Sequence, residues 1–160
     1  MDKELIFQNI PDKRQYKNTT SLKFKEDLLN VFEEIGKDYT LLEVGTNHGH
    51  TTRILSFIFE HVITLDWHEE PNLRIAREIC HDRKNITYIE KDVYATAWDD
   101  LKLPKYQVCF IDCGHEYEHV VSDIQNCMKF GDTSQYMIFD DYGHPTTGVK
   151  KAITDICNYC

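Results

Sequence analysis

The sequence is poor in positive charge and has no long apolar run. It has 18 Lys and Arg against 27 Asp and Glu in 160 residues, a net charge of -9. This argues against nucleic acid as a partner, because phosphate binding needs a basic surface. No apolar run approaches the roughly 20 residues that span a bilayer, and the first four residues include two acids and start no apolar signal core. We therefore expect a cytoplasmic protein that binds neither nucleic acid nor membrane.

The cysteines do not form the pattern of a disulfide framework. There are six, and they are scattered mostly inside apolar segments, which indicates reduced thiols. Cys157 and Cys160 make a C-x-x-C pair, but the second ligand pair that a zinc site needs is missing. The remaining composition, 41% hydrophobic and 28% charged, is that of an ordinary globular domain.

Short apolar segments alternate with amphipathic ones along most of the chain. Strands are predicted at residues 40–44, 61–66, 85–90, 106–112 and 135–140. Helices between them imply parallel βαβ units. We predict an α/β fold, a three-layer Rossmann-like doubly wound sheet that is mostly parallel, with strand order 3-2-1-4-5. Residues 1–20 are predicted to be an N-terminal arm and residues 21–160 a single domain.

Local signals set the predicted ends of the helices. Ser21 is typical of a helix N-cap, Gly36 of a helix stop, and Pro71 of the first turn of a helix. For the helix that ends before Gly131, the residues predicted to face inward are Val120, Val121, Ile124, Cys127 and Met128.

Residues 41–52, LLEVGTNHGHTT, read as a buried strand, a glycine turn and the start of a helix. Gly45 allows a sharp turn and a close approach to a ligand, and Gly49 lets the next helix pack close to the strand. The G-x-G-x-x-G fingerprint of dinucleotide sites is missing. Two glycines four residues apart, with Glu43 in front, suit a ligand without a phosphate.

Acids follow the next two predicted strands. Asp66 ends the second strand, where a carboxylate can accept hydrogen bonds from both ribose hydroxyls of a nucleoside, although it could also cap a helix. Trp67 could lie against an adenine ring or be an ordinary core or surface tryptophan. Asp92, after the third strand, could meet the adenine amino group or be an exposed loop acid.

Three further acids follow strands four and five. Because neighbouring strands lie about 4.8 Å apart, Asp112, Asp140 and Asp141 should converge at one point. Carboxylates that close repel one another unless a cation is present, and an all-oxygen set suits Mg²⁺. The alternative is that Asp140 and Asp141 only cap the last helix. His115, on the same loop as Asp112, is placed to take a proton from a hydroxyl.

These motifs together resemble the class I S-adenosylmethionine-dependent methyltransferases. The resemblance rests on EVGTNHGHTT (43–52), Asp66, FIDCGHEY (110–117) and IFDDYG (138–143). More narrowly, the motifs resemble the metal-dependent O-methyltransferases that act on small molecules, of the catechol, macrolide-sugar and cephalosporin-cluster types. In that branch the expected Mg²⁺ ligands are Asp112, Asp140 and Asp141, and His115 occupies the place of the base. The family usually adds a sixth and a seventh strand, which we expect to be missing or truncated here.

The resemblance implies S-adenosylmethionine and a divalent cation such as Mg²⁺ as cofactors and a small hydroxylated molecule as the acceptor. The residues expected to bind S-adenosylmethionine are Glu43, Gly45, Thr46, Asn47, His48, Gly49, Asp66, Trp67, Asp92, Val93 and Asp112. A non-catalytic S-adenosylmethionine-binding or scaffolding module is the alternative. A reductase dependent on NAD(P) is less favoured, since the third glycine is missing.

The fifth predicted strand would be an uncovered edge of the sheet if no hairpin follows it. Residues 136–139 contain neither proline nor lysine, the usual protection of an edge strand. We therefore predict that the edge is covered by self-association, as in a homodimer. The alternative is that residues 5–7 fold back over it.

Overall fold

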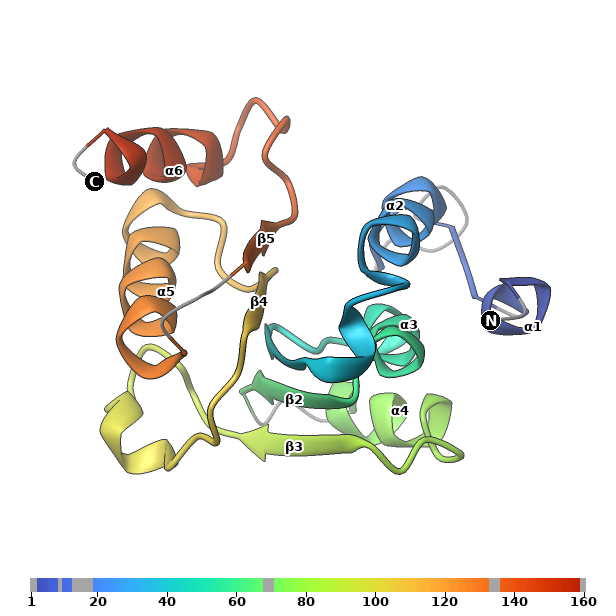
Figure 1. The fold of residues 1–160 in the computed structure, drawn as a ribbon. Coiled ribbons are helices and arrows are strands. Elements are labelled where there is room, and N and C mark those ends of the chain that lie inside the picture. The colour runs from blue at the N-terminus through green and yellow to red at the C-terminus, as the bar shows by residue number, and fades with distance from the viewer. Residues whose placement is uncertain (1–2, 9, 13–18, 68–70, 133–135, 159–160) are drawn as a thin grey trace.

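The computed structural model describes residues 3–8, 10–12, 19–67, 71–132 and 136–158. Its centre is one five-stranded sheet in which every pairing is parallel, in the order β3-β2-β1-β4-β5 (Figure 1). The strands are β1 (Thr40–Val44), β2 (His61–Asp66), β3 (Ile86–Glu90), β4 (Val108–Ile111) and β5 (Tyr136–Phe139). The predicted fold class and strand order are confirmed.

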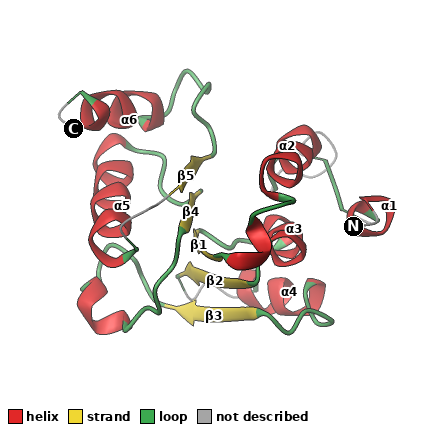
Figure 2. Cartoon of the chain, in the orientation of Figure 1, coloured by secondary structure: helices red, strands yellow, loops and turns green. Residues whose placement is uncertain are grey.

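Helices cover both faces of the sheet (Figure 2). On one side are α1 (Lys3–Phe7), α2 (Leu22–Phe32), α3 (His50–Ile58) and α4 (Asn72–Ile79), and on the other are α5 (Tyr117–Phe130) and α6 (Val149–Cys157). Two 3₁₀ turns, η1 (Gly36–Asp38) and η2 (Trp98–Leu101), complete the elements. In the described ranges, no helix has the length and apolar character needed to cross a membrane.

Each strand contributes to two cores, because successive side chains point to opposite faces of a sheet. Leu41, Val62 and Phe110 pack with α2 and α3, whereas Leu42 and Ile63 pack on the side of α5 and α6. All five are completely buried, and burying a side chain of this kind contributes about 1.5–3 kcal/mol. This double burial is why the strands read as continuous apolar runs.

Two of the predicted helix ends are right and two are shifted. α5 ends before Gly131, as predicted. Ser21 caps α2, because its hydroxyl accepts the N–H of Phe24 at 3.1 Å. Gly36 does not end this helix: α2 stops at Phe32, and Gly36 begins η1 instead. Pro71 precedes α4 as its N-cap rather than lying in the first turn.

The prediction that Met128 faces inward is wrong, since Met128 is 53% exposed. The buried stripe of α5 runs through Val120, Asp123, Ile124 and Cys127. At 3.6 residues per turn Met128 lies about 80° around the helix from Val120, on the edge away from Asp123. The buried stripe therefore includes Asp123, which a prediction based on apolar residues alone leaves out.

The N-terminal segment packs against the domain. Ile6 and Ile10 are buried in the core beside α3, and α1 contacts α3. In Figure 1, α1 lies on the far side of α2 from β5, so the alternative in which residues 5–7 cover β5 is wrong. β5 is the edge strand, with Tyr136 48% exposed, and self-association across it stays a prediction.

Candidate active site

A cavity of about 290 Å³ lies at the carboxyl ends of β1, β4 and β5. Gly45, Asp112 and Asp140 are the residues that follow these three neighbouring strands. The strand ladder continues to the cavity, because the N–H of Asp112 donates to Val44 O at 2.9 Å and that of Asp140 to Ile111 O at 3.2 Å. Parallel α/β sheets place their ligands at this edge.

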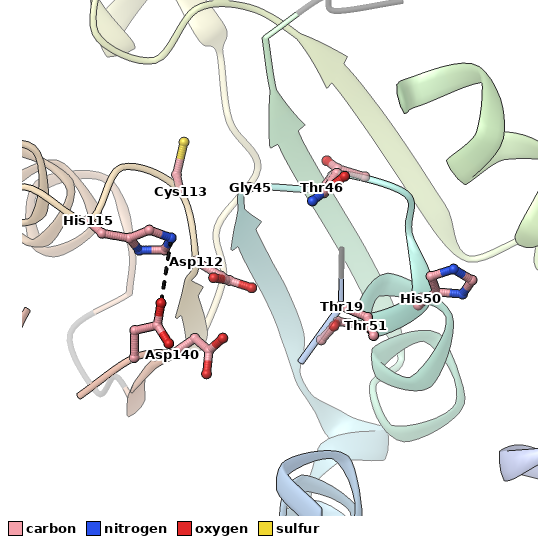
Figure 3. A pocket seen from close by; sticks show the side chains of 11 residues that line it. Thr19, Gly45, Thr46, His50, Thr51, Asp112, Cys113, His115 and Asp140 are labelled. Carbon is pink, nitrogen blue, oxygen red and sulfur yellow. Dashed lines mark ion pairs between the residues drawn. The ribbon is translucent and has the colours of Figure 1, made fainter. Parts of the chain in front are cut away.

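The acidic wall of the cavity comes from the segments after β4 and β5. Asp112, Cys113, His115, Asp140 and Asp141 line it, so the structure brings together the four residues that the sequence placed at this edge, Asp112, His115, Asp140 and Asp141. His115 Nε2 lies 3.7 Å from Asp141 Oδ2, the dashed pair in Figure 3. An imidazolium formed at His115 would be stabilised by that carboxylate.

The opposite wall is polar and comes from the N-terminal half of the chain. In Figure 3, Thr19, His50 and Thr51 lie across Gly45 from the acidic wall, and Thr46 and Asn47 complete the lining. Sequence reasoning did not single out Thr19 or Thr51. Thr51 belongs to the 41–52 motif although no role was predicted for it, but Thr19 lies far from any motif, and only the fold brings it to the cavity.

Gly45 is required by its backbone and by its neighbours. Its φ is 102°, and a Cβ at this position would lie 2.1 Å from the carbonyl oxygen of Asp112. Gly49 also has a positive φ, 75°. The close contact that Gly49 permits is with Ala76 of α4, at 2.7 Å from a Cβ, rather than with the strand as the sequence suggested.

Glu43 lies beneath the cavity and does not line it. It is completely buried, and the hydroxyls of Thr52 and Thr64 donate to its Oε2 at 2.6 Å each. Thr64 has only one proton to give, so Thr46 must donate to Thr64 across their 2.6 Å contact. Glu43 thereby fixes the lining residue Thr46 through one intervening hydroxyl.

The other carboxylate oxygen of Glu43, Oε1, has no hydrogen-bond partner within the described ranges. Burial raises the pKa of Glu43 to about 8, which outweighs the lowering by the two threonine hydroxyls. The folded chain therefore holds this proton at a pH where the unfolded chain has lost it. Glu43 contributes stability that is complete below the ordinary carboxyl pKa and declines as the pH rises to about 8.

We predict that Glu43→Gln removes this decline. Relative to wild type, the variant should gain up to about 4 kcal/mol in free energy of unfolding between pH 5 and pH 8.5, since each unit of pKa shift corresponds to about 1.4 kcal/mol. The melting temperature should change in the same direction. Thermal denaturation at the two pH values measures it, with the exposed Glu60→Gln as the matched control. An equal wild-type-to-variant difference at both pH values would contradict a proton held by Glu43.

Asp66 holds the Gly45 loop from the side of β2. Its Oδ2 accepts the N–H groups of Thr46 and Asn47, each at 2.7 Å, and its Oδ1 accepts the N–H of Trp67 at 2.7 Å. A carboxylate offers about four lone-pair positions, which leaves Oδ1 able to accept a ribose hydroxyl as well. Asp66 and Trp67 are not among the residues lining the cavity, and Trp67 is 62% exposed.

Three further residues expected to bind the cofactor, Asp92, Val93 and His48, also lie outside the cavity lining. Asp92 accepts the N–H groups of Tyr94 and Ala95 at 2.9 and 3.1 Å and so caps its own turn. Val93 is a core residue, and the ring of His48 pairs with Asn72 at 3.0 Å. Their roles toward a cofactor stay predictions.

Lys25 is a buried cation beside the cavity that the sequence reasoning missed. Its ammonium donates to Thr20 O at 2.7 Å, to Thr19 Oγ1 at 2.8 Å and to Pro11 O at 3.2 Å. Burial lowers the pKa of Lys25 to about 8, against the attraction of Asp12, Asp140 and Asp112. The signal was present, since Lys25 shares the buried stripe of α2 with Leu28, Leu29 and Phe32.

The carboxylates do not fit a metal ion in their present arrangement. Among the described residues, no three His, Cys, Asp or Glu side chains are grouped closely enough to hold one. Asp112 and Asp140 attract the ammonium of Lys25, and Asp141 faces His115. The sequence prediction of a three-aspartate magnesium site is thus not supported by this geometry.

Comparison with known families identifies this arrangement. Residues 42–142 match the model of a family described as a methyltransferase domain. The chain belongs to this methyltransferase family. The match runs from β1 through the Gly45 loop to Asp141, so it includes all of the acidic wall. S-adenosylmethionine is the cofactor expected of this fold.

Individual relatives are distant. The chain is 27% identical over 127 residues to the uncharacterized protein R132 of Acanthamoeba polyphaga mimivirus. The aligned region covers 73% of this chain and 57% of the viral protein. The chain thus spans little more than half the length of this viral relative.

Two solved structures share the fold at 16% identity. One is a precorrin-6y C5,15-methyltransferase from Geobacter metallireducens, which superposes with a TM-score of 0.70 over 90% of this chain and 74% of that chain. The other is a proposed O-methyltransferase from Klebsiella pneumoniae, with a TM-score of 0.66 over 98% of this chain and 83% of that chain.

Proposed function

We propose that this methyltransferase domain transfers the methyl group of S-adenosylmethionine to a hydroxyl of a small molecule. The observation that carries the proposal is the cavity where the Gly45 loop faces a wall containing Asp112, Asp140 and His115. The sulfonium of S-adenosylmethionine is a cation, and carboxylates at the edge of a partly closed cavity attract it. The same wall supplies a group that can remove the proton of an acceptor.

The reaction needs few groups from the protein. The acceptor oxygen attacks the sulfonium methyl in line, the oxygen–methyl bond forms as the sulfur–methyl bond breaks, and neutral S-adenosylhomocysteine leaves. We assign to His115 the removal of the hydroxyl proton and to Asp141 the stabilisation of the resulting imidazolium, given their 3.7 Å separation. Most of the rate would come from holding the two reactants in line.

A hydroxyl acceptor is favoured over a carbon acceptor by the base in the cavity wall. The related structures include both kinds, since one is described as a C5,15-methyltransferase and another as an O-methyltransferase. An oxygen nucleophile must lose its proton, and His115 lines the cavity where that proton would be released. No step is assigned to Mg²⁺, because the carboxylates do not fit it as they stand.

The cofactor assignment is tested by calorimetry. We predict that S-adenosylmethionine or S-adenosylhomocysteine binds in the micromolar range, roughly 8 kcal/mol. Asp66→Ala should weaken binding by about 1–3 kcal/mol, since it removes both the anchor of the Thr46 and Asn47 amides and the acceptor proposed for the ribose. The control is Asp99→Ala, which removes an acid from an exposed ion pair with Lys129.

The outcomes separate the alternatives. Binding of NAD without S-adenosylmethionine would contradict the proposal. Binding of S-adenosylmethionine without transfer to any of a panel of phenols, catechols and sugars would favour a non-catalytic binding module. Repeating the titration with Mg²⁺ and with EDTA shows whether the bound cofactor rearranges the carboxylates into a metal site.

A further inference from the structure

Tyr94 lies behind the loop that carries Asp112 and His115, and the mechanism above does not use it. The N–H of Gly114, in the middle of that loop, donates to Tyr94 Oη at 2.8 Å, and this hydroxyl contacts Asp123 Oδ2 at 3.1 Å. An amide nitrogen only donates and a phenol has a single proton. The direction is therefore fixed: Gly114 donates to Tyr94, and Tyr94 donates to Asp123.

Tyr94 and His119 leave no room for a side chain at Gly114. A Cβ on Gly114 would lie 2.5 Å from Tyr94 Oη and 2.6 Å from His119 Nδ1. The rings of Tyr94 and His119 are themselves stacked, 4.1 Å apart and tilted by 20°. The loop thus rests directly on a surface made by these two rings, and a larger residue than glycine would be pushed off it.

The neighbouring residue is held from another element. The carbonyl of His115 accepts the N–H of Gly148, just before α6, at 2.7 Å. Consecutive residues of the loop are therefore fixed on two sides, by Tyr94 at Gly114 and by Gly148 at His115. The position of the His115 side chain in the cavity depends on both contacts.

Asp123 holds the Tyr94 hydroxyl from the interior of the protein. It is completely buried, and its other oxygen has no hydrogen-bond partner in the described part of the chain. Burial raises the pKa of Asp123 to about 7. The titratable groups that face it are Tyr94, Cys113 after β4 and Cys127 on its own helix, with His119 beyond the Tyr94 ring.

We propose that Tyr94 is a positioning residue of this methyltransferase: its hydroxyl, oriented by Asp123, fixes Gly114 and with it the placement of Asp112 and His115 in the cavity. The consequence for ligand binding rests on the proposed function, whereas the contact itself does not. An ionised Asp123 accepts the Tyr94 proton more strongly than a neutral one, and this makes the Tyr94 oxygen a better acceptor for Gly114.

Amide hydrogen exchange followed by NMR tests the contact. Tyr94→Phe should speed exchange of the Gly114 amide by about tenfold, the size expected for one lost hydrogen bond. The control is Tyr106→Phe, which likewise removes a single tyrosine hydroxyl, one that donates to Cys127 O at 3.1 Å in the core. Tyr106 precedes β4 at the opposite end of the sheet from the cavity, so this variant should lower the melting temperature and leave Gly114 unchanged.

Two further measurements test the role of the contact. In wild type, protection of the Gly114 amide, corrected for the intrinsic rate, should increase as the pH rises through about 7, whereas Asp123→Asn should show no such step because its side chain does not titrate. Calorimetry with S-adenosylhomocysteine should show about tenfold weaker binding in Tyr94→Phe and no change in Tyr106→Phe.

Unchanged exchange of Gly114 in Tyr94→Phe would overturn the proposal, as would faster exchange with unaltered affinity for S-adenosylhomocysteine. If the pH-dependent step in Gly114 protection persists in Asp123→Asn, Asp123 does not orient the Tyr94 hydroxyl. If wild type fails to bind S-adenosylhomocysteine at all, the proposed function is wrong, and the exchange data still decide whether Tyr94 fixes the loop.

Discussion

Replacing His115 by alanine is expected to lower turnover by about 10²–10⁴-fold, the usual loss for a general base, with little change in cofactor affinity. The reason is geometric. His115 lines the cavity beside Asp112 and faces Asp141 at 3.7 Å, so its loss removes the proton acceptor and leaves the Gly45 loop intact. Turnover is measured as release of S-adenosylhomocysteine with the best acceptor of the panel, and affinity by calorimetry.

His61→Ala is the matched control for this experiment. His61 begins β2, at the opposite end of the sheet from the cavity, where its ring pairs with Thr87 at 3.0 Å. This variant should keep wild-type turnover. A His115→Ala enzyme that turns over within a fewfold of wild type would exclude His115 as the base and leave it a lining residue.

Replacing Gly45 by alanine is expected to have the largest effect on stability and to abolish cofactor binding. Alanine at a φ of 102° is strained by about 1–3 kcal/mol, and a Cβ placed 2.1 Å from the Asp112 carbonyl oxygen adds about 1–3 kcal/mol for overpacking. Because Asp112 follows β4, the neighbour of β1 in the sheet, the added methyl group would push the Gly45 loop and the acidic wall of the cavity apart. Urea denaturation and calorimetry measure the two effects.

Gly143→Ala provides the comparison, since nothing lies within 4 Å of a Cβ at that position. It should change neither the urea midpoint nor cofactor affinity. A Gly45→Ala variant with the same urea midpoint as wild type would mean that the two strand ends separate easily, and Gly45 would not be required by its contact with Asp112.

The fold was predictable because the decisive signals are local. Each strand is an apolar run, each helix has a stripe, and parallel connections leave few possible topologies. The wrong face of α5 and the missed Lys25 both arose where a polar residue belongs to the buried stripe. Asp123 in α5 and Lys25 in α2 are both fully buried, and taking the apolar residues alone rotated the predicted face of α5 toward Met128.

The candidate site was predictable only where strand order dictates it. Gly45, Asp112 and Asp140 meet because β1, β4 and β5 are neighbours. Thr19 reaches the same region through a non-local fold of the N-terminal segment, which no spacing reveals. The helical spacing in α2 indicates that Lys25 is buried, but not that it lies beside the cavity. The support that Tyr94 gives to Gly114 crosses 20 residues and depends on a contact between loops, for which the sequence has no periodic signal.

The central position of β1 has a consequence for how the chain reaches its native state. Leu41 pairs with Val62 on one side and with Val108 on the other. During synthesis, β1, β2 and β3 are complete well before β4 leaves the ribosome, so one side of β1 must wait for its neighbour with unpaired backbone groups. Such non-local pairing is slow, and until it forms the nascent chain carries an open apolar strand that chaperones or other chains can bind.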